Sequence, residues 1–204
     1  MARPASPEPT DARILDIAAE HVRRYGLART TVVSIAAEAG MSHANVYRYF
    51  PSKDSLIDAL TDHWLKPIES GLHEIADSPD PADDKLERIV SALYRAYRNK
   101  VETDPNLFKI FVEAVEEGRA IARRHRGRLQ AEILRVIDEG MTGGVFRQGD
   151  QRRTMALVFD GLHRFVHPVP ARLDRDVPRE QMDLRFERLA QVVLRSLAGR
   201  SPRF

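Results

Sequence analysis

One short stretch, residues 31–54, constrains the fold of this chain more than any other part of its sequence. Three hydroxyl residues stand where helices would begin, and a glycine and a proline stand where helices would end. These five residues are Thr31, Ser42, Ser52, Gly40 and Pro51. They divide the stretch into two short helices joined by a tight turn, with a third helix beginning at Lys53. This spacing predicts a helix-turn-helix.

The apolar residues of the stretch fall on the faces that such a motif must bury. Ile35, Ala36 and Ala39 give the first helix an apolar stripe, and the small Ala36 lets the two helices approach. In the second helix, Val46 and either Tyr49 or Phe50 are expected to face inward. The remaining face of the second helix is then free to enter a DNA major groove.

We expect the residues on and beside this outward face to contact DNA. His43 and Asn45 can reach base edges, and asparagine suits a bidentate pair with adenine. Ala44 is small enough to approach a thymine methyl group, whereas Tyr47 and Lys53 fit phosphate contacts and Arg48 fits either role. The complete predicted set is Thr31, Ser42, His43, Ala44, Asn45, Tyr47, Arg48, Tyr49 and Lys53. The alternative is a solvated surface helix in a helical bundle.

This motif resembles the DNA-binding domain of the TetR family of bacterial transcription regulators, over the stretch from Ile14 to Leu60. The most specific part is Gly40-Met-Ser-His-Ala-Asn-Val-Tyr-Arg-Tyr-Phe-Pro-Ser-Lys-Asp-Ser-Leu56. That family carries Leu-Tyr-x-(Tyr/His)-Phe-x-(Ser/Asn)-Lys there, and Val46 replaces the leucine while keeping its buried role. The resemblance implies a three-helix head and a six-helix body.

Composition and charge limit the other possibilities. The 204 residues contain no cysteine, which fits a reducing cytoplasm and excludes disulfide frameworks and thiolate metal sites. No signal peptide or membrane-spanning apolar run is evident, so a cytoplasmic protein is expected. Residues 1–65 carry seven Lys and Arg against eight Asp and Glu. Because the head is not basic as a whole, DNA binding must depend on a local patch of side chains.

The rest of the chain is predicted to be helical, because no segment alternates with a period of two. The expected class is therefore all-α, with a disordered tail at 1–10, a helix-turn-helix domain at 11–60, and an effector-binding and dimerisation domain at 61–204. Helices are expected at about 11–25, 53–77, 82–102, 105–118, 119–141, 151–166 and 178–197, with a proline-containing loop between the last two.

The last two helices predict a homodimer. Each is apolar over more of its circumference than a surface helix needs, and a two-fold pairing of both helices would cover the second apolar face. The residues expected in this interface are Phe159, Leu162, Phe165, Phe186, Leu189, Val193 and Leu197. Burial in the core of a single chain is the alternative. A dimer also suits the head, because two recognition helices about 34 Å apart meet successive major grooves of a near-palindromic operator.

Aromatic residues gather in the body, and the TetR resemblance places a ligand cavity among its middle helices. The residues predicted to line it are Trp64, Tyr94, Tyr97, Phe108, Phe111, Val112, Leu129 and Ile133. Such a lining favours a small apolar or aromatic effector. The alternative is that these side chains simply form the core.

Two further patterns are interpreted conservatively. His163 and His167 have the spacing of paired metal ligands, with His125 as a candidate third ligand, but no carboxylate completes a metal motif. We expect polar packing near the dimer seam and no metal or cofactor. The basic run 119–128 is expected to be solvated or paired with acidic side chains, for which Glu113, Glu116 and Glu117 are the candidates.

The function predicted from the sequence is therefore a ligand-responsive transcriptional repressor that leaves its operator when an effector binds. The helix at 53–77 would connect the cavity to the head, so that a displacement at Trp64 or Ile68 moves the recognition helix. The alternatives are an activating role, or a helical scaffold or enzyme that has lost DNA binding. An enzyme is not expected, because the sequence contains no catalytic constellation.

Overall fold

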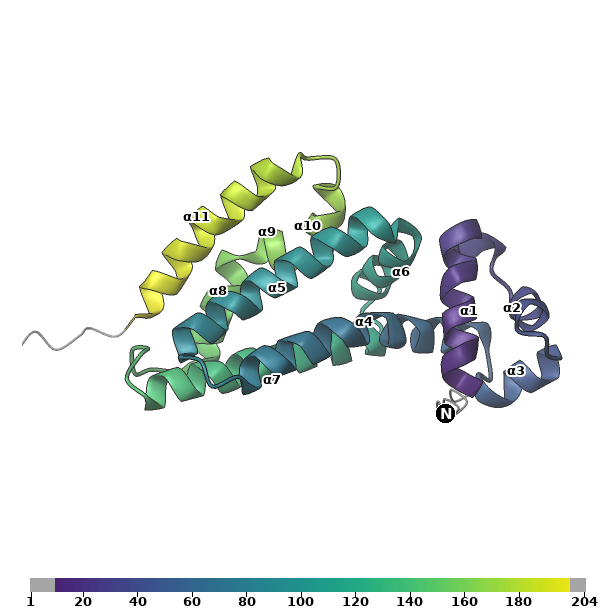
Figure 1. The fold of residues 1–204 in the computed structure, drawn as a ribbon, viewed down its shortest axis with the longest axis horizontal. Coiled ribbons are helices and arrows are strands. Elements are labelled where there is room, and N and C mark those ends of the chain that lie inside the picture. Colours follow the sequence, from purple (N-terminus) through teal and green to yellow (C-terminus); the bar gives the residue numbers. More distant parts are fainter. Residues whose placement is uncertain (1–9, 199–204) are drawn as a thin grey trace, which may run out of the picture.

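The computed structural model describes residues 10–198. These residues form an elongated all-α molecule with a small N-terminal head at one end and a larger body at the other (Figure 1). The described part contains no strand, only an isolated antiparallel bridge between Phe146 and Ala198. The predicted fold class is thus confirmed, while the predicted tail at 1–10 lies almost wholly outside the described residues.

The head consists of three helices and one short 3-10 turn. Their bounds are α1 (Thr10–Tyr25), η1 (Leu27–Arg29), α2 (Val32–Ala39) and α3 (His43–Tyr49). Ile14, Ile35 and Val46, one from each helix, are completely buried together and hold the three helices around one small core.

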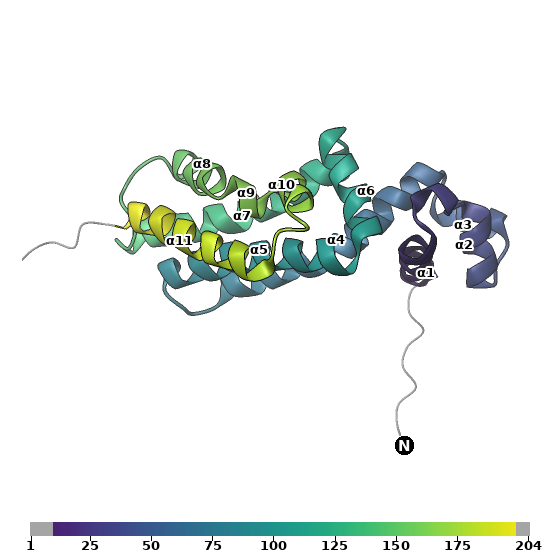
Figure 2. The same ribbon diagram turned by 90° about the horizontal axis from the view of Figure 1, so that it is seen from above.

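The long helix α4 leaves the head and runs along one side of the body, where it packs beside α5 and α7 (Figures 1 and 2). Its helices are α4 (Lys53–Asp77), α5 (Ala82–Thr103), α6 (Pro105–Glu116), α7 (Ala120–Thr142), α8 (Gln151–Gly161), α9 (His163–Val166), α10 (Pro168–Leu173) and α11 (Arg179–Leu197). The body therefore has eight helices among the described residues rather than the expected six.

The difference arises between residues 151 and 173, where one helix and the start of a loop were predicted and three helices, α8, α9 and α10, are found. Helix α8 ends at Gly161, where an added Cβ would lie 2.7 Å from Val193 Cγ2, so α8 and α11 approach too closely there for a side chain. Pro168 then begins α10, since proline fits the first turn of a helix, and the His167 ring caps it by accepting from the Val169 N–H at 3.3 Å.

Candidate nucleic-acid interface and ligand cavity

The helix-turn-helix is fixed by the capping residues that the sequence predicts. The Thr31 hydroxyl accepts from the Ser34 N–H at 3.0 Å, and the Ser34 hydroxyl accepts in return from the Thr31 N–H at 3.0 Å. Ser42 caps α3 by accepting from the Asn45 N–H at 3.2 Å. Gly40 ends α2 with φ +67°, a left-handed conformation that favours glycine. The predicted caps and turn are confirmed.

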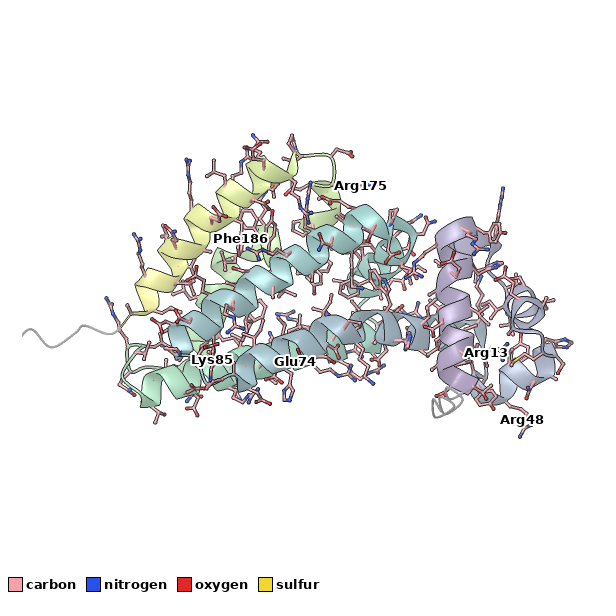
Figure 3. All side chains as sticks on the ribbon, in the orientation of Figure 1. Arg13, Arg48, Glu74, Lys85, Arg175 and Phe186 are labelled. Carbon is pink, nitrogen blue, oxygen red and sulfur yellow. The ribbon has the colours of Figure 1, made fainter. Side chains whose placement is uncertain are left out.

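Helix α3 turns most of its side chains toward solvent. Val46 is completely buried and Phe50 is 8% exposed, so Phe50 rather than Tyr49 takes the second inward position. Tyr47 and Tyr49 are each 44% exposed. Arg48 projects from the outer side of the head (Figure 3). The other exposed members of the predicted DNA-contact set are Thr31, Ser42, His43, Ala44 and Lys53.

Two members of that set already have neighbours within the head. Asn45 is half-buried, with its amide nitrogen 4.0 Å from the Met41 sulfur. The Lys53 ammonium donates to the Leu27 carbonyl oxygen at 3.4 Å. Both contacts hold a side chain beside the recognition helix, and neither is a strong bond.

Several carboxylates of the head and of the start of α4 form ion pairs away from α3. Glu38 is paired with His21 at 2.9 Å, Glu20 with Arg24 at 2.8 Å, and Asp58 with Arg119 at 2.9 Å. None of these carboxylates lies on α3, which contains Arg48 and no acidic residue. These three carboxylates therefore have partners away from the exposed face of α3.

The head and the body meet at a polar junction centred on Asp104. Its carboxylate accepts from Arg23 Nε of α1 at 2.6 Å and from Trp64 Nε1 of α4 at 3.1 Å. Lys100 donates to the Trp64 carbonyl oxygen at 2.9 Å and lies 3.9 Å from the centre of the Trp64 ring. Burial lowers the pKa of Lys100 to about 8, although the Asp104 charge opposes this shift. Trp64 thus belongs to the junction.

A cavity of about 410 Å³ lies between α5, α6, α7 and the α8–α10 segment. It is lined by Tyr97, Phe111, Val115, Gly118, Ala122, Arg123, His125, Arg126, Leu129, Phe159, Asp160, His163, Val166, His167 and Pro168. A hollow of about 530 Å³ near the start of α5 is larger, but charged side chains dominate its lining. We take the 410 Å³ cavity as the candidate ligand site because it combines aromatic, aliphatic and polar groups.

Three of the eight residues predicted for the lining, Tyr97, Phe111 and Leu129, do line this cavity. The other five do not, because each is occupied elsewhere. Tyr94 stacks on Phe186 with ring centroids 4.4 Å apart and donates to Asp183 at 2.7 Å. Phe186 projects from α11 toward the body interior (Figure 3). Trp64 is in the junction described above, and three residues are buried in the core: Phe108, Val112 and Ile133.

A chain of hydrogen bonds that was not predicted from the sequence connects the cavity wall to α4. His125 of α7 is 1% exposed, with Nε2 3.0 Å from the Tyr97 hydroxyl and Nδ1 2.7 Å from Glu69 Oε1. Arg128 donates to the second Glu69 oxygen at 2.7 Å. We call Tyr97, His125, Glu69 and Arg128 the polar relay.

The protonation states within the relay follow from its geometry. Burial opposes ionisation of Glu69, but hydrogen bonds and charges from His125 and Arg128 outweigh it and lower the pKa of Glu69. Burial also raises the pKa of Tyr97, so its hydroxyl keeps its proton. The ionised Glu69 carboxylate can only accept, so His125 Nδ1–H donates to it, and the Tyr97 hydroxyl lies within hydrogen-bond distance of His125 Nε2. Both ring nitrogens of His125 therefore have a partner, and every group in the relay is satisfied.

The basic run at 119–128 divides into two faces. Arg119 pairs with Asp58 at 2.9 Å, and Arg128 pairs with Asp62 at 3.0 Å and with Glu69. The acidic partners thus lie on α4, because α7 packs along that helix. Glu113, Glu116 and Glu117 were the predicted partners. For two of them the prediction is wrong, because Glu113 pairs with Lys109 and Glu116 pairs with Arg172.

His163 and His167 line the ligand cavity, with their rings stacked at a centroid distance of 4.5 Å. Burial, with the nearby His163 and Arg126, lowers the pKa of His167. The described residues contain no group of three or more His, Cys, Asp or Glu side chains arranged to hold a metal ion. The two histidines therefore form part of the cavity wall.

Most residues predicted for a dimer interface are buried within one chain. Five of the seven have at most 6% of their surface exposed: Leu162, Phe165, Phe186, Val193 and Leu197. Phe159 is half-buried beside the ligand cavity, and Leu189 is 38% exposed. The outward apolar side chains of α8 and α11 are instead Leu157, Leu184, Leu189 and Val192.

The fold joins a helix-turn-helix head, with α3 exposed, to a separate helical body that contains a cavity. A family model described as bacterial regulatory proteins of the tetR family matches residues 14–60. A second model, the tetracyclin repressor-like C-terminal domain, matches residues 82–190. The chain belongs to the TetR family of bacterial regulatory proteins.

Individual relatives are more distant. The HTH-type transcriptional regulator BetI of Brucella anthropi is 27% identical over 128 residues, covering 62% of this chain and 66% of BetI. The HTH-type transcriptional repressor KstR2 of Rhodococcus jostii is 29% identical over 139 residues, covering 66% of each chain. The fatty acid degradation regulator FadR of Bacillus halodurans has a similar fold, with a TM-score of 0.68, 19% identity and coverage of 93% and 96%.

None of the described helices combines the length and apolar character needed to cross a membrane.

Proposed function

We propose that the protein is a dimeric transcriptional repressor that binds a near-palindromic operator through α3 and releases it when a small effector binds in the body. The observation that supports DNA binding best is the exposed face of α3, which is anchored by Val46 and Phe50 and carries no acidic side chain. Thr31, Tyr47, Arg48 and Lys53 would hold phosphates, while His43, Ala44 and Asn45 would face the bases. Such a regulator acts on DNA in the bacterial cytoplasm.

The division of labour follows the two parts of the fold. We assign DNA binding to residues 11–60, and effector binding and dimerisation to residues 61–204. The 410 Å³ cavity is the proposed effector site, and its volume lies within the usual range for small-molecule pockets. One relative, KstR2 of Rhodococcus jostii, is named a transcriptional repressor, and this favours repression over activation.

Dimerisation would cover the apolar side chains that α8 and α11 expose. Leu157, Leu184, Leu189 and Val192 lie on the outward faces of these helices, and Leu184 and Val192 are 47% and 66% exposed. A two-fold axis would pair these faces into a four-helix interface and place two copies of α3 on successive major grooves.

The test is an electrophoretic mobility shift with DNA from upstream of the protein's own gene. Wild-type protein should bind one fragment specifically, and its affinity should fall steeply as salt concentration rises. Tyr47→Ala and Arg48→Ala should each weaken binding about tenfold or more, because each removes a contact of about 1–3 kcal/mol. Lys109→Ala, an exposed change on α6, is the matched control and should bind normally.

Failure to bind any genomic fragment specifically, with the protein folded, would contradict the proposal and favour a scaffold without DNA binding. Reporter expression in cells distinguishes the regulatory sign. Deletion of the gene should raise expression from the bound promoter if the protein represses, and lower it if the protein activates.

A further inference from the structure

We propose that the ligand cavity binds an organic acid, with a carboxylate at a cationic rim and an aromatic or short aliphatic group in the apolar interior. This inference rests on the proposed function, because it names the chemical class of the effector. The cavity wall is divided accordingly. Phe111, Leu129 and Phe159 supply apolar surface, whereas Arg123, Arg126, His163 and His167 supply positive or hydrogen-bond-donating groups.

Two arginines of the rim have no acidic partner among the described residues, although others on the same helix do. Arg119 and Arg128 pair with carboxylates of α4. Arg123 and Arg126, which face the cavity, form no ion pair in the described part of the chain. Arg123 donates to the Gly118 carbonyl oxygen. Since the two lie one turn apart on α7, both guanidinium groups can approach one carboxylate.

The two histidines add donors on the opposite side of the rim. The His167 Nδ1 atom accepts from the Val169 N–H, so a neutral His167 ring carries its proton on Nε2. The His163 ring stacks against it at 4.5 Å. An anion placed between these rings and the arginines would receive charge-assisted hydrogen bonds.

The remaining polar groups of the wall do not favour a different ligand. Among the described residues that line the cavity, Asp160 is the one carboxylate, against two arginines, so the rim keeps an excess of positive charge. Tyr97 and His125 are already hydrogen-bonded within the polar relay, so the deeper wall needs no polar partner from a ligand. A ligand with a carboxylate at one end and an apolar group at the other therefore matches both halves of the site.

Matched pairs of ligands test this directly. Phenylacetate, cinnamate and hexanoate are each compared with the corresponding neutral carboxamide, by thermal unfolding and by titration calorimetry at low salt. We expect at least one acid to bind about tenfold or more tightly than its amide, and the preference to narrow at higher ionic strength.

Variants connect the preference to the rim. Arg126→Gln and Arg123→Gln should each weaken binding of the preferred acid about tenfold and leave amide binding unchanged. Arg124→Gln, an exposed change between them that does not line the cavity, should have no effect. Equal binding of acids and amides, insensitivity of acid binding to both rim variants, or no binding by any acid would each overturn the inference.

Operator binding of the ligand-free protein is measured in parallel. Intact DNA binding together with any of those negative results rejects the acidic effector alone. Loss of specific DNA binding by wild-type protein rejects the proposed function instead, whatever the ligand results.

Discussion

Single glycines decide how closely the helices of the body can pack. A Cβ added at Gly140 of α7 would lie 2.1 Å from Phe146 Cδ2, so the Phe146 ring rests directly on the helix backbone. The Phe146 side chain is 4% exposed and lies beside the bridge that holds the end of α11. Gly127 lies on the same helix, is exposed, and has no neighbour within 4 Å of an added Cβ.

We expect Gly140→Ala and Gly127→Ala to change stability in opposite directions. Gly140→Ala should lower the free energy of unfolding by about 1–3 kcal/mol, because Phe146 must move. Gly127→Ala should raise it by about 0.5–1 kcal/mol, because alanine favours a helix over glycine. Urea unfolding followed by circular dichroism measures both. Equal effects of the two substitutions would show that helix propensity, and not the packing of Phe146, determines the change in the free energy of unfolding.

At this scale the sequence predicts local structure far better than it predicts partners. Thr31, Gly40 and Ser42 act on their immediate neighbours, so their roles can be read from spacing alone. His125 could not be assigned in this way, because Tyr97 and Glu69 reach it from helices distant in the chain. Aromatic residues such as Tyr94 and Phe108 look alike in sequence, whether they line a cavity or fill a core.

Among the elements, α4 is the one that belongs to both halves of the molecule. Its first turns pack against α1, and its middle carries Trp64 and Glu69. The sequence predicts its bounds correctly, because Ser52 caps its start and residues 78–81 contain two prolines. The sequence assigned the coupling to Trp64 or Ile68, whereas the contact that joins α4 to the ligand cavity is made by Glu69.

We expect His125→Phe to uncouple the effector from DNA release. The phenyl ring fills similar space but bonds to neither Tyr97 nor Glu69, so the cavity wall loses its polar connection to α4. Ligand-free protein should bind its operator within about twofold of wild type, whereas the loss of DNA affinity caused by a bound effector should shrink about tenfold, a coupling change of about 1.4 kcal/mol. Mobility shifts with and without effector measure this quantity.

A second histidine provides the control. His73 of α4 pairs with Glu132 of α7 at 2.9 Å but does not line the ligand cavity. His73→Phe should therefore leave effector-induced release unchanged. If both variants reduce release equally, general loosening of the α4–α7 contact explains the effect, and the relay has no special role.

At the scale of the whole molecule, the face through which two copies would pair is the property hardest to predict from the sequence. The apolar width of the last two helices predicted a dimer, but it could not tell the face that packs on the core from the face that is left over. Phe186 and Val193 take the inner face, and Leu184 and Val192 the outer one. Only the path of the chain in space separates these two sets.

We expect Leu184→Glu combined with Val192→Glu to convert the dimer into a folded monomer. Two buried carboxylates facing their two-fold mates would repel and lose solvation, whereas in a monomer both remain in water. Light scattering after size-exclusion chromatography measures the mass, and operator affinity should fall by at least tenfold. Leu173→Glu, at a 74% exposed site on α10, is the control and should leave the mass unchanged. A double variant that keeps the dimeric mass would place the interface elsewhere.

The length of α4, which continues through Pro67 from the head to Asp77, would give the protein a mechanical advantage. With 25 residues, the helix is about 37 Å long, and about 24 Å separate Glu69 from the end that enters the head. A tilt of about 5° at Glu69 would therefore carry that end through about 2 Å. In a two-fold dimer the α4 helices of both chains would tilt, and the displacements of the two heads would add along the operator. An effector as small as one aromatic ring could then change the distance between the two copies of α3.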